Sequence, residues 1–311
     1  MTGRSSRRRQ RGIALMLVMW VLALLTVLAV SLTATQRTET ALAENHLGAA
    51  RFRALADAAL AYTALDFLTQ PAALEEETQA TWLPNGQERR WRFNGSEIGI
   101  AVFNETSRIN INRVQPQTLT DLLIVLGVSE DEAGPLAAAI VDWRDEDDLA
   151  LLNGAEDEDY EREGLAFGAK DADYASVEEL RQVLGMREDI YQRLAPEVTV
   201  AGEAANPLER FASPAVIAAT RGISLEEAVE EVATRDLARV PEATAARSLD
   251  RGGPLYRVQV TERGRDRTGR RMEALLQLNR GQPPPYLVLW RRYGLSLQDP
   301  VYGETERFEG D

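Results

Sequence analysis

Eleven carboxylates and two arginines lie between residues 142 and 163, so this stretch carries a net charge of −9 (2 − 11). Such crowding costs electrostatic repulsion unless a cation offsets it. Calcium takes about six to eight oxygen ligands, often from several carboxylates and backbone carbonyls. The sequence between the acidic residues is typical of a loop that wraps an ion, although the EF-hand pattern is absent. The stretch therefore predicts a calcium site, with a solvated acidic surface as the alternative. The candidate ligands are Asp145, Asp147, Asp148, Glu156, Asp157 and Asp159.

The residues needed for several other kinds of chemistry are missing from this chain. It has no cysteine, and its one histidine, His46, follows a long apolar segment. The chain therefore lacks the residues for a histidine-bound zinc site, and its one histidine is poorly placed for a Ser-His-Asp triad. Carboxylate-pair chemistry of the glycosidase kind stays open on composition alone, but few aromatic residues accompany the crowded carboxylates. We therefore expect no catalytic residues and a protein that is not an enzyme.

Three stretches with one shared pattern follow residue 110, and each is an apolar helix, a glycine and another helix. They span residues 122–133, 180–191 and 216–228, around Gly127, Gly185 and Gly222. These units resemble helix-hairpin-helix elements, in which a Gly-x-Gly turn holds DNA phosphates. The second glycine is missing from all three, and the chain after its first 12 residues carries a charge of −19 (−14 − 5), which repels phosphate. We expect helix pairs that pack as a small bundle and bind no nucleic acid.

Alternating apolar residues predict strands on both sides of this helical stretch. They are Trp91, Phe93, Ile98, Ile100 and Val102 before it, and Tyr256, Val258, Val260, Met272, Ala274, Leu276 and Leu278 after it. Asn94-Gly95 is a good hairpin turn between the first strands. Because a lone hairpin is marginal, the flanking pieces belong in one sheet. The expected fold class is α+β, with a small antiparallel sheet from residues 71–109 and 250–311. A large all-helical domain, SAM-like or helix-hairpin-helix-like, is inserted at residues 110–249, and two independent domains are the alternative.

The first 37 residues have the pattern of a membrane anchor. Five arginines precede Gly12, and the 24 residues from Ile13 to Gln36 (37 − 13) carry no charge. About 20 apolar residues suffice to cross a bilayer, and basic residues favour the cytoplasmic side. We expect one helix from Ile13 to about Leu68, about 84 Å long. Residues 13–36 are expected to be its transmembrane half, and residues 37–70 its outer half. A cleaved secretory signal and a plain anchor are the alternatives.

The outer half of this helix carries one apolar stripe, formed by Phe52, Leu55, Ala56, Ala59 and Leu60. Their helical spacing predicts a face that packs against another part of the structure. Pro71 is expected to end the helix.

The string Arg9-Gln10-Arg11-Gly12-Ile13-Ala14-Leu15-Met16 places a glycine between the basic head and the apolar run. This resembles the class III signal of type IV pilins and type II secretion pseudopilins. The resemblance implies that residues 1–12 are a leader, that prepilin peptidase cuts after Gly12, and that the new first residue, Ile13, is N-methylated. Most members have glutamate at the fifth mature position, where this chain has Leu17. The resemblance is therefore to the K type of minor pseudopilin, in which this glutamate is typically missing.

Further motifs carry the same resemblance to the general secretion pathway protein K family. They are Asn110-Ile111-Asn112, the run from Asp142 to Asp147, Gly154-Ala155-Glu156 with Tyr160, and Glu179-Leu180 ahead of Tyr191 and Leu194-Ala195-Pro196. With the N-terminal signal, the resemblance covers Arg11 to about Val200. It implies a pilin-like fold whose long N-terminal helix packs on the sheet, and calcium as the bound ion.

The function implied by the resemblance is that of a minor pseudopilin at the tip of the type II secretion pseudopilus, which starts the pseudopilus and supports export across the outer membrane. The implied partners are minor pseudopilins of the I, J and H types, prepilin peptidase and inner-membrane lipid. The chain would cross the inner membrane once, with its N-terminus cytoplasmic and its body periplasmic. The alternative is a membrane-anchored periplasmic binding protein or enzyme with an uncleaved anchor.

Overall fold

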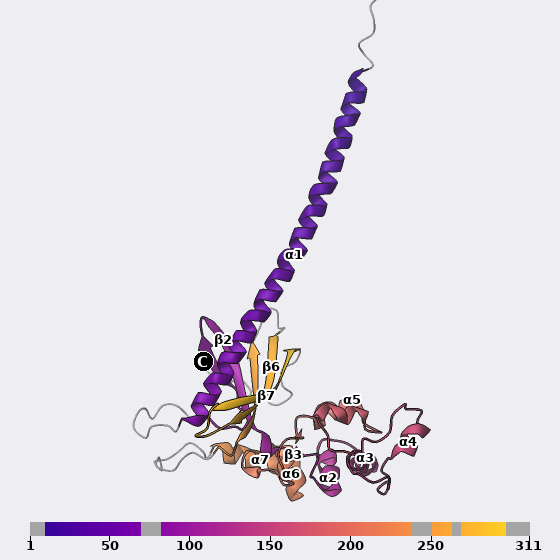
Figure 1. Ribbon diagram of the computed structural model, residues 1–311, viewed down its shortest axis with the longest axis vertical. Coiled ribbons are helices and arrows are strands. Elements are labelled where there is room, and N and C mark those ends of the chain that lie inside the picture. The colour runs from indigo at the N-terminus through magenta and orange to yellow at the C-terminus, as the bar shows by residue number, and fades with distance from the viewer. Residues whose placement is uncertain (1–9, 70–81, 238–250, 263–268, 297–311) are drawn as a thin grey trace, which may run out of the picture. The chain divides into compact units, whose positions relative to one another are not determined.

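The computed structural model describes residues 10–69, 82–237, 251–262 and 269–296. The chain divides into two compact units, Met1–Asp57 and Ala58–Asp311. One helix, α1 (Gln10–Leu68), forms the described part of the first unit and continues into the second (Figure 1). The long helix expected from Ile13 to about Leu68 is confirmed.

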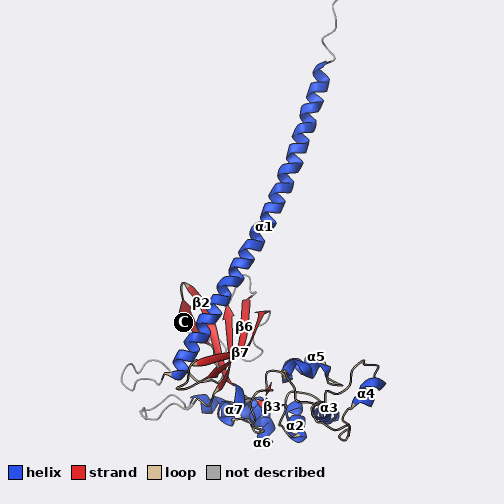
Figure 2. Cartoon of the chain, in the orientation of Figure 1, coloured by secondary structure: helices blue, strands red, loops and turns tan. Residues whose placement is uncertain are grey.

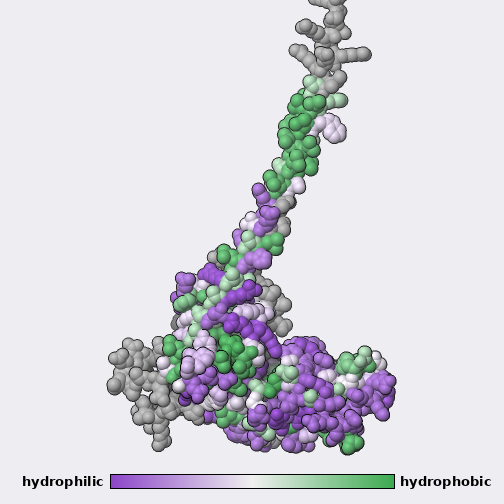
Figure 3. Space-filling model, in the orientation of Figure 1, coloured by the Kyte–Doolittle hydropathy of each residue, from purple (hydrophilic) through white to green (hydrophobic). Residues whose placement is uncertain are grey.

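The first unit carries the apolar segment of α1. Ala14–Thr33 is long and apolar enough to span a membrane, with a mean hydropathy of 2.7. The large apolar side chains between Leu15 and Leu32 are 47–78% exposed, and they form the green upper part of the helix in Figure 3. Because water would not favour such a surface, this segment fits a bilayer, as the sequence predicts.

The second unit contains one five-stranded antiparallel sheet in the order β1-β2-β5-β6-β7 (Figure 2). The strands are β1 (Arg89–Phe93), β2 (Ser96–Asn104), β5 (Leu255–Glu262), β6 (Gly269–Leu278) and β7 (Tyr286–Ser296). Asn94 and Gly95, with φ of 48° and 73°, form the predicted hairpin turn between β1 and β2. Strands from two distant parts of the chain thus share one sheet, since β2 pairs directly with β5.

The core of the sheet follows the predicted alternation. Ile100, Val102, Val258 and Val260 are fully buried. The last turns of α1 supply Ala59, Leu60 and Phe67, which are 0–2% exposed. Phe67 meets Trp82 and Tyr256 edge to face, with ring centroids 5.5 and 5.0 Å apart. The second half of the predicted apolar stripe on the helix is therefore part of this core. Phe52, Leu55 and Ala56, in the first unit, are 0–5% exposed.

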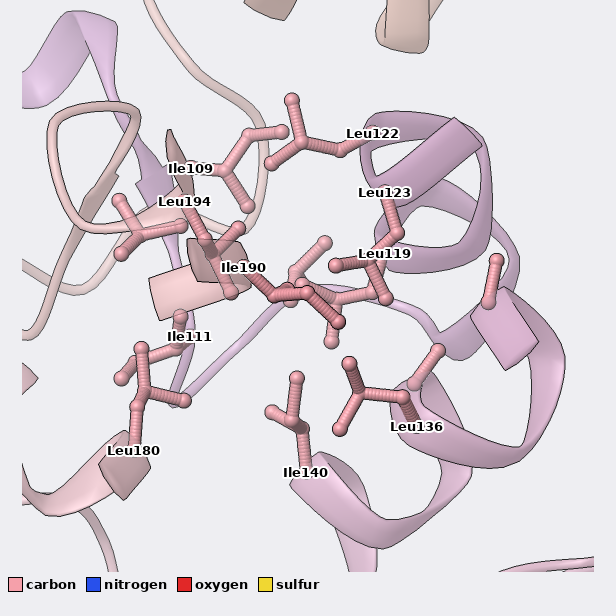
Figure 4. Packing of buried hydrophobic residues seen from close by; sticks show 14 of the residues in the cluster. Ile109, Ile111, Leu119, Leu122, Leu123, Leu136, Ile140, Leu180, Ile190 and Leu194 are labelled. Atoms are coloured by element: carbon pink, nitrogen blue, oxygen red, sulfur yellow. The ribbon is translucent and has the colours of Figure 1, made fainter. Parts of the chain in front are cut away.

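Six helices lie between β2 and β5 in the described part of the sequence. They are α2 (Pro116–Val125), α3 (Glu130–Asp142), α4 (Asp157–Arg162), α5 (Glu188–Leu194), α6 (Pro214–Arg221) and α7 (Leu225–Leu237), with 3₁₀ turns η1 (Glu105–Ser107), η2 (Val177–Gln182) and η3 (Glu209–Phe211). Leucine and isoleucine side chains from α2, α3, η2 and α5 converge on one core (Figure 4). The α+β fold class is therefore confirmed, with one difference: β3 (Ile109–Asn110) and β4 (Val198–Thr199) form a short parallel ladder inside the region expected to be all-helical.

The three helix-glycine-helix units are present. Gly127 joins α2 to α3, Gly185 joins η2 to α5, and Gly222 joins α6 to α7. All three have φ between 67° and 83°, a left-handed conformation that favours glycine. The glycines therefore act as turn residues between packed helices.

A buried ion pair joins the sheet to the ladder below it. Arg257 of β5 donates to both oxygens of Glu105 in η1, at 2.9 and 2.5 Å. The hydroxyl of Thr199 in β4 donates to the same carboxylate at 2.7 Å. The two side chains of the pair are 9% and 1% exposed. Burial alone would raise the pKa of Glu105, but Arg257, Arg108 and these hydrogen bonds outweigh it, and the pKa lies below its ordinary value.

Candidate functional site

The acidic stretch lies on an aromatic base at the end of α3. The ring of Trp143 is stacked on that of Tyr174, with centroids 6.4 Å apart, and is tilted relative to that of Tyr160, with centroids 5.8 Å apart. All three residues are at most 3% exposed. The Tyr160 hydroxyl accepts a hydrogen bond from the Leu184 amide at 3.0 Å. The Tyr174 hydroxyl donates to the Ile140 carbonyl at 2.9 Å. This base holds the loops on both sides of α4 in place.

Asp142 shapes the first of these loops. Its fully buried carboxylate accepts the amide hydrogens of Leu151 at 3.2 Å and Ala155 at 2.8 Å. A Cβ atom on Gly154 would lie 1.8 Å from the nearer carboxylate oxygen, so only glycine fits there. Asp142 thus folds residues 151–155 back over the end of α3. Asp142 belongs to the acidic stretch but is not among the six predicted ligands.

Burial and mutual repulsion both raise the pKa values of carboxylates in the loop. Burial raises the pKa of Glu156 to about 7, and Asp142, Asp145, Asp171 and Asp148 add to the rise. Burial also raises the pKa of Asp145, with Asp142 and Asp147 as further causes. A group that resists ionisation near neutral pH among other carboxylates is a frequent property of functional sites. In this loop, the repulsion would be relieved by a cation.

Two carboxylate oxygens of the loop are also left without a hydrogen-bond partner. Asp145 Oδ1 and Glu156 Oε1 are buried without a hydrogen-bond partner. A buried acceptor left unsatisfied costs about 1–3 kcal/mol, and both lie among oxygen donors of the kind that calcium prefers. No group of three or more histidine, cysteine, aspartate or glutamate side chains in the described ranges is already arranged as a metal site. The donors therefore fit calcium in chemistry, and the loop would have to close around the ion.

The six predicted ligands take different positions. Asp145 and Glu156 hold the unpartnered oxygens. Asp147 accepts the amide hydrogen of Leu149 at 2.9 Å. Asp157 fits closely against Gly168, where an added Cβ would lie 1.7 Å from its carboxylate oxygen. Asp148 is exposed and acts on the cluster through its charge, since it raises the pKa of Glu156.

Asp159 has a structural role in this arrangement. Its carboxylate accepts the Glu156 amide hydrogen at 3.1 Å and pairs with Arg162 at 2.6 Å. The first hydrogen bond closes a capping box at the start of α4. The hydrogen bonds from Glu156 and Arg162 lower the pKa of Asp159, so it differs from the repelled carboxylates beside it.

Asp171 also belongs to the cluster, although it is not among the six predicted ligands. It has a left-handed backbone with φ of 54°. Burial raises its pKa, and Asp157 and Asp148 raise it further. Asp171 lies outside residues 142–163 and directly follows Lys170, so the local density of acidic residues does not predict that it joins the cluster.

The predicted processing residues, Gly12 and Ile13, lie at the start of α1. Gly12 and Ile13 are within the helix, but their side chains, and residues 1–9 of the predicted leader, lie outside what the structure describes. Leu17 is 63% exposed on the apolar segment. His46 is also exposed, on the part of α1 that follows this segment.

Comparison with known proteins gives consistent matches. Residues 99–203 match the family model described as type II secretion system (T2SS), protein K. Type II secretion system protein K of Klebsiella pneumoniae is 35% identical over 208 residues, which cover 61% of this chain and 62% of that protein. The protein of the same name from Dickeya chrysanthemi is 28% identical over 244 residues, covering 62% and 66%. The match thus spans less than two thirds of these relatives.

A solved structure shares the fold. A chain in the crystal structure of the GspK-GspI-GspJ complex from the enterotoxigenic Escherichia coli type 2 secretion system matches with a TM-score of 0.54 and 18% identity. The match covers 83% of this chain and 100% of that one. The fold of most of this chain thus recurs in a solved protein.

Proposed function

Because residues 99–203 carry the domain of type II secretion system protein K, we propose that this chain is a minor pseudopilin that caps the tip of the type II secretion pseudopilus. It would help to start the pseudopilus and support export across the outer membrane. Its role is assembly, without catalysis. The match of the helical region to this family is the observation that carries the proposal.

Two features of the chain support a position at the tip. The helices inserted between β2 and β5 add bulk that a subunit placed above would have to avoid. Leu17 stands where most pseudopilins have a glutamate, and a carboxylate in lipid needs a partner such as the free amine of a neighbouring subunit. A chain without this carboxylate need not dock onto another subunit in that way.

The proposed partners are minor pseudopilins of the I, J and H types. The solved structure with this fold comes from a complex of GspK with GspI and GspJ. We expect the full chain, extracted in detergent, to co-purify with I- and J-type subunits from the same bacterium. Failure to bind either subunit would count heavily against the proposal, and an unrelated single-pass membrane protein serves as the control for detergent carry-over.

Processing of the N-terminus gives a second test. We propose that prepilin peptidase cuts after Gly12 and that Ile13 is N-methylated, with the N-terminus cytoplasmic and the body periplasmic. Mass spectrometry of the mature chain should show loss of residues 1–12 and a methyl group on the new first residue. Gly12→Val should retain the leader, and Gly3→Val should be processed normally. An intact wild-type N-terminus, or cleavage near Ala34, would show that the segment is an ordinary anchor or signal.

We also propose that the acidic cluster binds calcium. The two unpartnered buried oxygens of Asp145 and Glu156 support this. Asp147, Asp148, Asp157 and Asp171 lie close enough to act on the cluster through their charges. Bound calcium would supply the positive charge that the loop lacks.

A further inference from the structure

Two leucines project from the loop between α3 and α4. Leu149 is 76% exposed and Leu152 is 88% exposed, and Leu151 between them is 38% exposed. Leu149 and Leu152 are the two most exposed large apolar side chains among the described residues of the second unit. A lone exposed leucine needs no explanation, but two within four residues at the highest exposure form a distinct apolar projection. We call residues 149–152 the leucine tip.

Hydrogen bonds hold the leucine tip in one shape. The Asp147 carboxylate accepts the Leu149 amide hydrogen at 2.9 Å, and the Asp142 carboxylate accepts that of Leu151 at 3.2 Å. The Gly154 amide donates to the Leu151 carbonyl at 2.8 Å. The loop is therefore tied on both sides of its most exposed residue. A surface fixed in advance loses less conformational entropy when it binds a partner.

The charges beside the leucine tip indicate which partner fits. Three exposed acidic residues, Glu146, Asp147 and Asp148, directly precede Leu149, so three carboxylates border the apolar side chains. Anionic lipid headgroups would be repelled by this border. A protein pocket with an apolar floor and a rim of arginine or lysine complements both the leucines and the charges.

We propose that the leucine tip docks into an apolar pocket of another protein, and that the rim of this pocket carries arginine or lysine side chains that face the exposed carboxylates of residues 146–148. The docking goes beyond the proposed function, because it requires neither a position at the pseudopilus tip nor a bound calcium ion.

Photo-crosslinking in the bacterium that makes the full chain tests this directly. The photoreactive residue p-benzoylphenylalanine replaces Leu152, and as a control it replaces Val229, which is 49% exposed on α7. We expect position 152 to give one protein adduct that position 229 does not give. The crosslinked peptide, identified by mass spectrometry, should contain apolar residues together with arginine or lysine.

Reversing the charge of Glu146 tests whether the adduct depends on charge complementarity between the acidic border and the basic rim. Glu146→Lys in the crosslinking chain should lower the adduct yield by about tenfold, because it places like charges against the basic rim. Glu146 is exposed and is not one of the proposed calcium ligands. Glu226→Lys, a matched exposed change on α7, should leave the yield within about twofold. Resistance of both variants to trypsin shows that they are folded.

Several outcomes would overturn the proposal. A lipid adduct would assign the leucine tip to a membrane surface. A protein adduct whose yield is unchanged by Glu146→Lys would show that the partner's pocket has no basic rim facing these carboxylates. The absence of any adduct from a folded, fully expressed chain would show that the leucine tip has no partner.

Discussion

Replacing Arg257 by methionine should lower the free energy of unfolding of the second unit by about 3–5 kcal/mol, because it leaves the Glu105 carboxylate buried without its main counter-charge. Both side chains are at most 9% exposed, and Arg257 donates to both carboxylate oxygens. Arg108 remains, with its Nε 3.7 Å from the carboxylate, but it is too distant to replace the lost hydrogen bonds. Chemical denaturation of the full chain in detergent, followed by tryptophan fluorescence, measures the loss.

Two further variants distinguish the effect of breaking the buried ion pair from the effect of removing a surface charge. Arg257→Met combined with Glu105→Gln should recover most of the lost stability, because the amide oxygen is neutral and still accepts the hydrogen bond from Thr199. Arg92→Met breaks an ion pair with Glu97 at 2.7 Å whose side chains are 85% and 43% exposed. It should cost about 1 kcal/mol or less. Equal losses from Arg92→Met and Arg257→Met would contradict the account.

The pH dependence of this effect has a definite sign. The folded-state pKa of Glu105 lies below its ordinary value of 4.5, so the pair stabilises the wild-type chain above that pH and the contribution fades as the pH falls through the folded-state pKa. In Arg257→Met the buried carboxylate lacks its partner and its pKa should rise. The stability difference between the two chains should therefore be largest near neutral pH and should shrink as the pH is lowered toward 4.5.

Periodicity explains which elements of the fold could be predicted. The apolar residues that alternate along β2, β5 and β6 are all buried, and the three helix-glycine-helix units have a glycine at each turn, so both patterns appear in the sequence. β3 and β4 contain two residues each, which is too short for any alternation. In β7 no alternation of apolar and polar residues appears in the sequence, because residues 286–290 are all apolar although Leu287 and Leu289 are exposed. The pairing of β7 with β6 also shifts register between Leu275 and Leu276.

Contacts between distant residues explain what the sequence could not predict. Glu105 and Arg257 are 152 positions apart, and neither residue type suggests burial. Composition predicted an acidic site between residues 142 and 163. Asp171 joins this cluster because the loop after α4 returns to the end of α3, where the Lys170 amide donates to the Trp143 carbonyl at 3.2 Å. Asp142 was part of the predicted stretch, and its role as the acceptor for the Leu151 and Ala155 amides depends on how the loop closes.

The second large effect concerns calcium. If the ion binds the folded chain alone, free calcium at about 100 times its dissociation constant should raise the free energy of unfolding by about 2.7 kcal/mol, and a chelator should remove that increment. Tryptophan fluorescence, to which Trp143 beneath the cluster contributes, follows the unfolding transition. The measurement uses the full chain in detergent with calcium or with chelator. An unfolding curve that is the same in both would mean that the acidic stretch is only a solvated surface.

Glu156→Gln should change stability in opposite directions in the two conditions. Without calcium, the neutral amide replaces a carboxylate that is repelled by Asp142 and Asp145. In the presence of chelator, the variant should therefore be more stable than the wild-type chain. With calcium, the variant lacks one negative ligand and should lose more than half of the increment. Glu163→Gln neutralises an exposed carboxylate of the same stretch and should alter both values by about 0.5 kcal/mol or less.

The raised pKa of Glu156 also links calcium to protons. Its folded-state value of about 7 exceeds the ordinary value of 4.5, so the calcium-free chain should lose stability as the pH rises from 4.5 to about 7, where the unfolded chain ionises this group more readily. A bound ion favours the ionised form and opposes that loss. The calcium increment should therefore grow as the pH rises through about 7 in the wild-type chain. In Glu156→Gln this growth should be largely absent, because the group that exchanges a proton for the ion is no longer there.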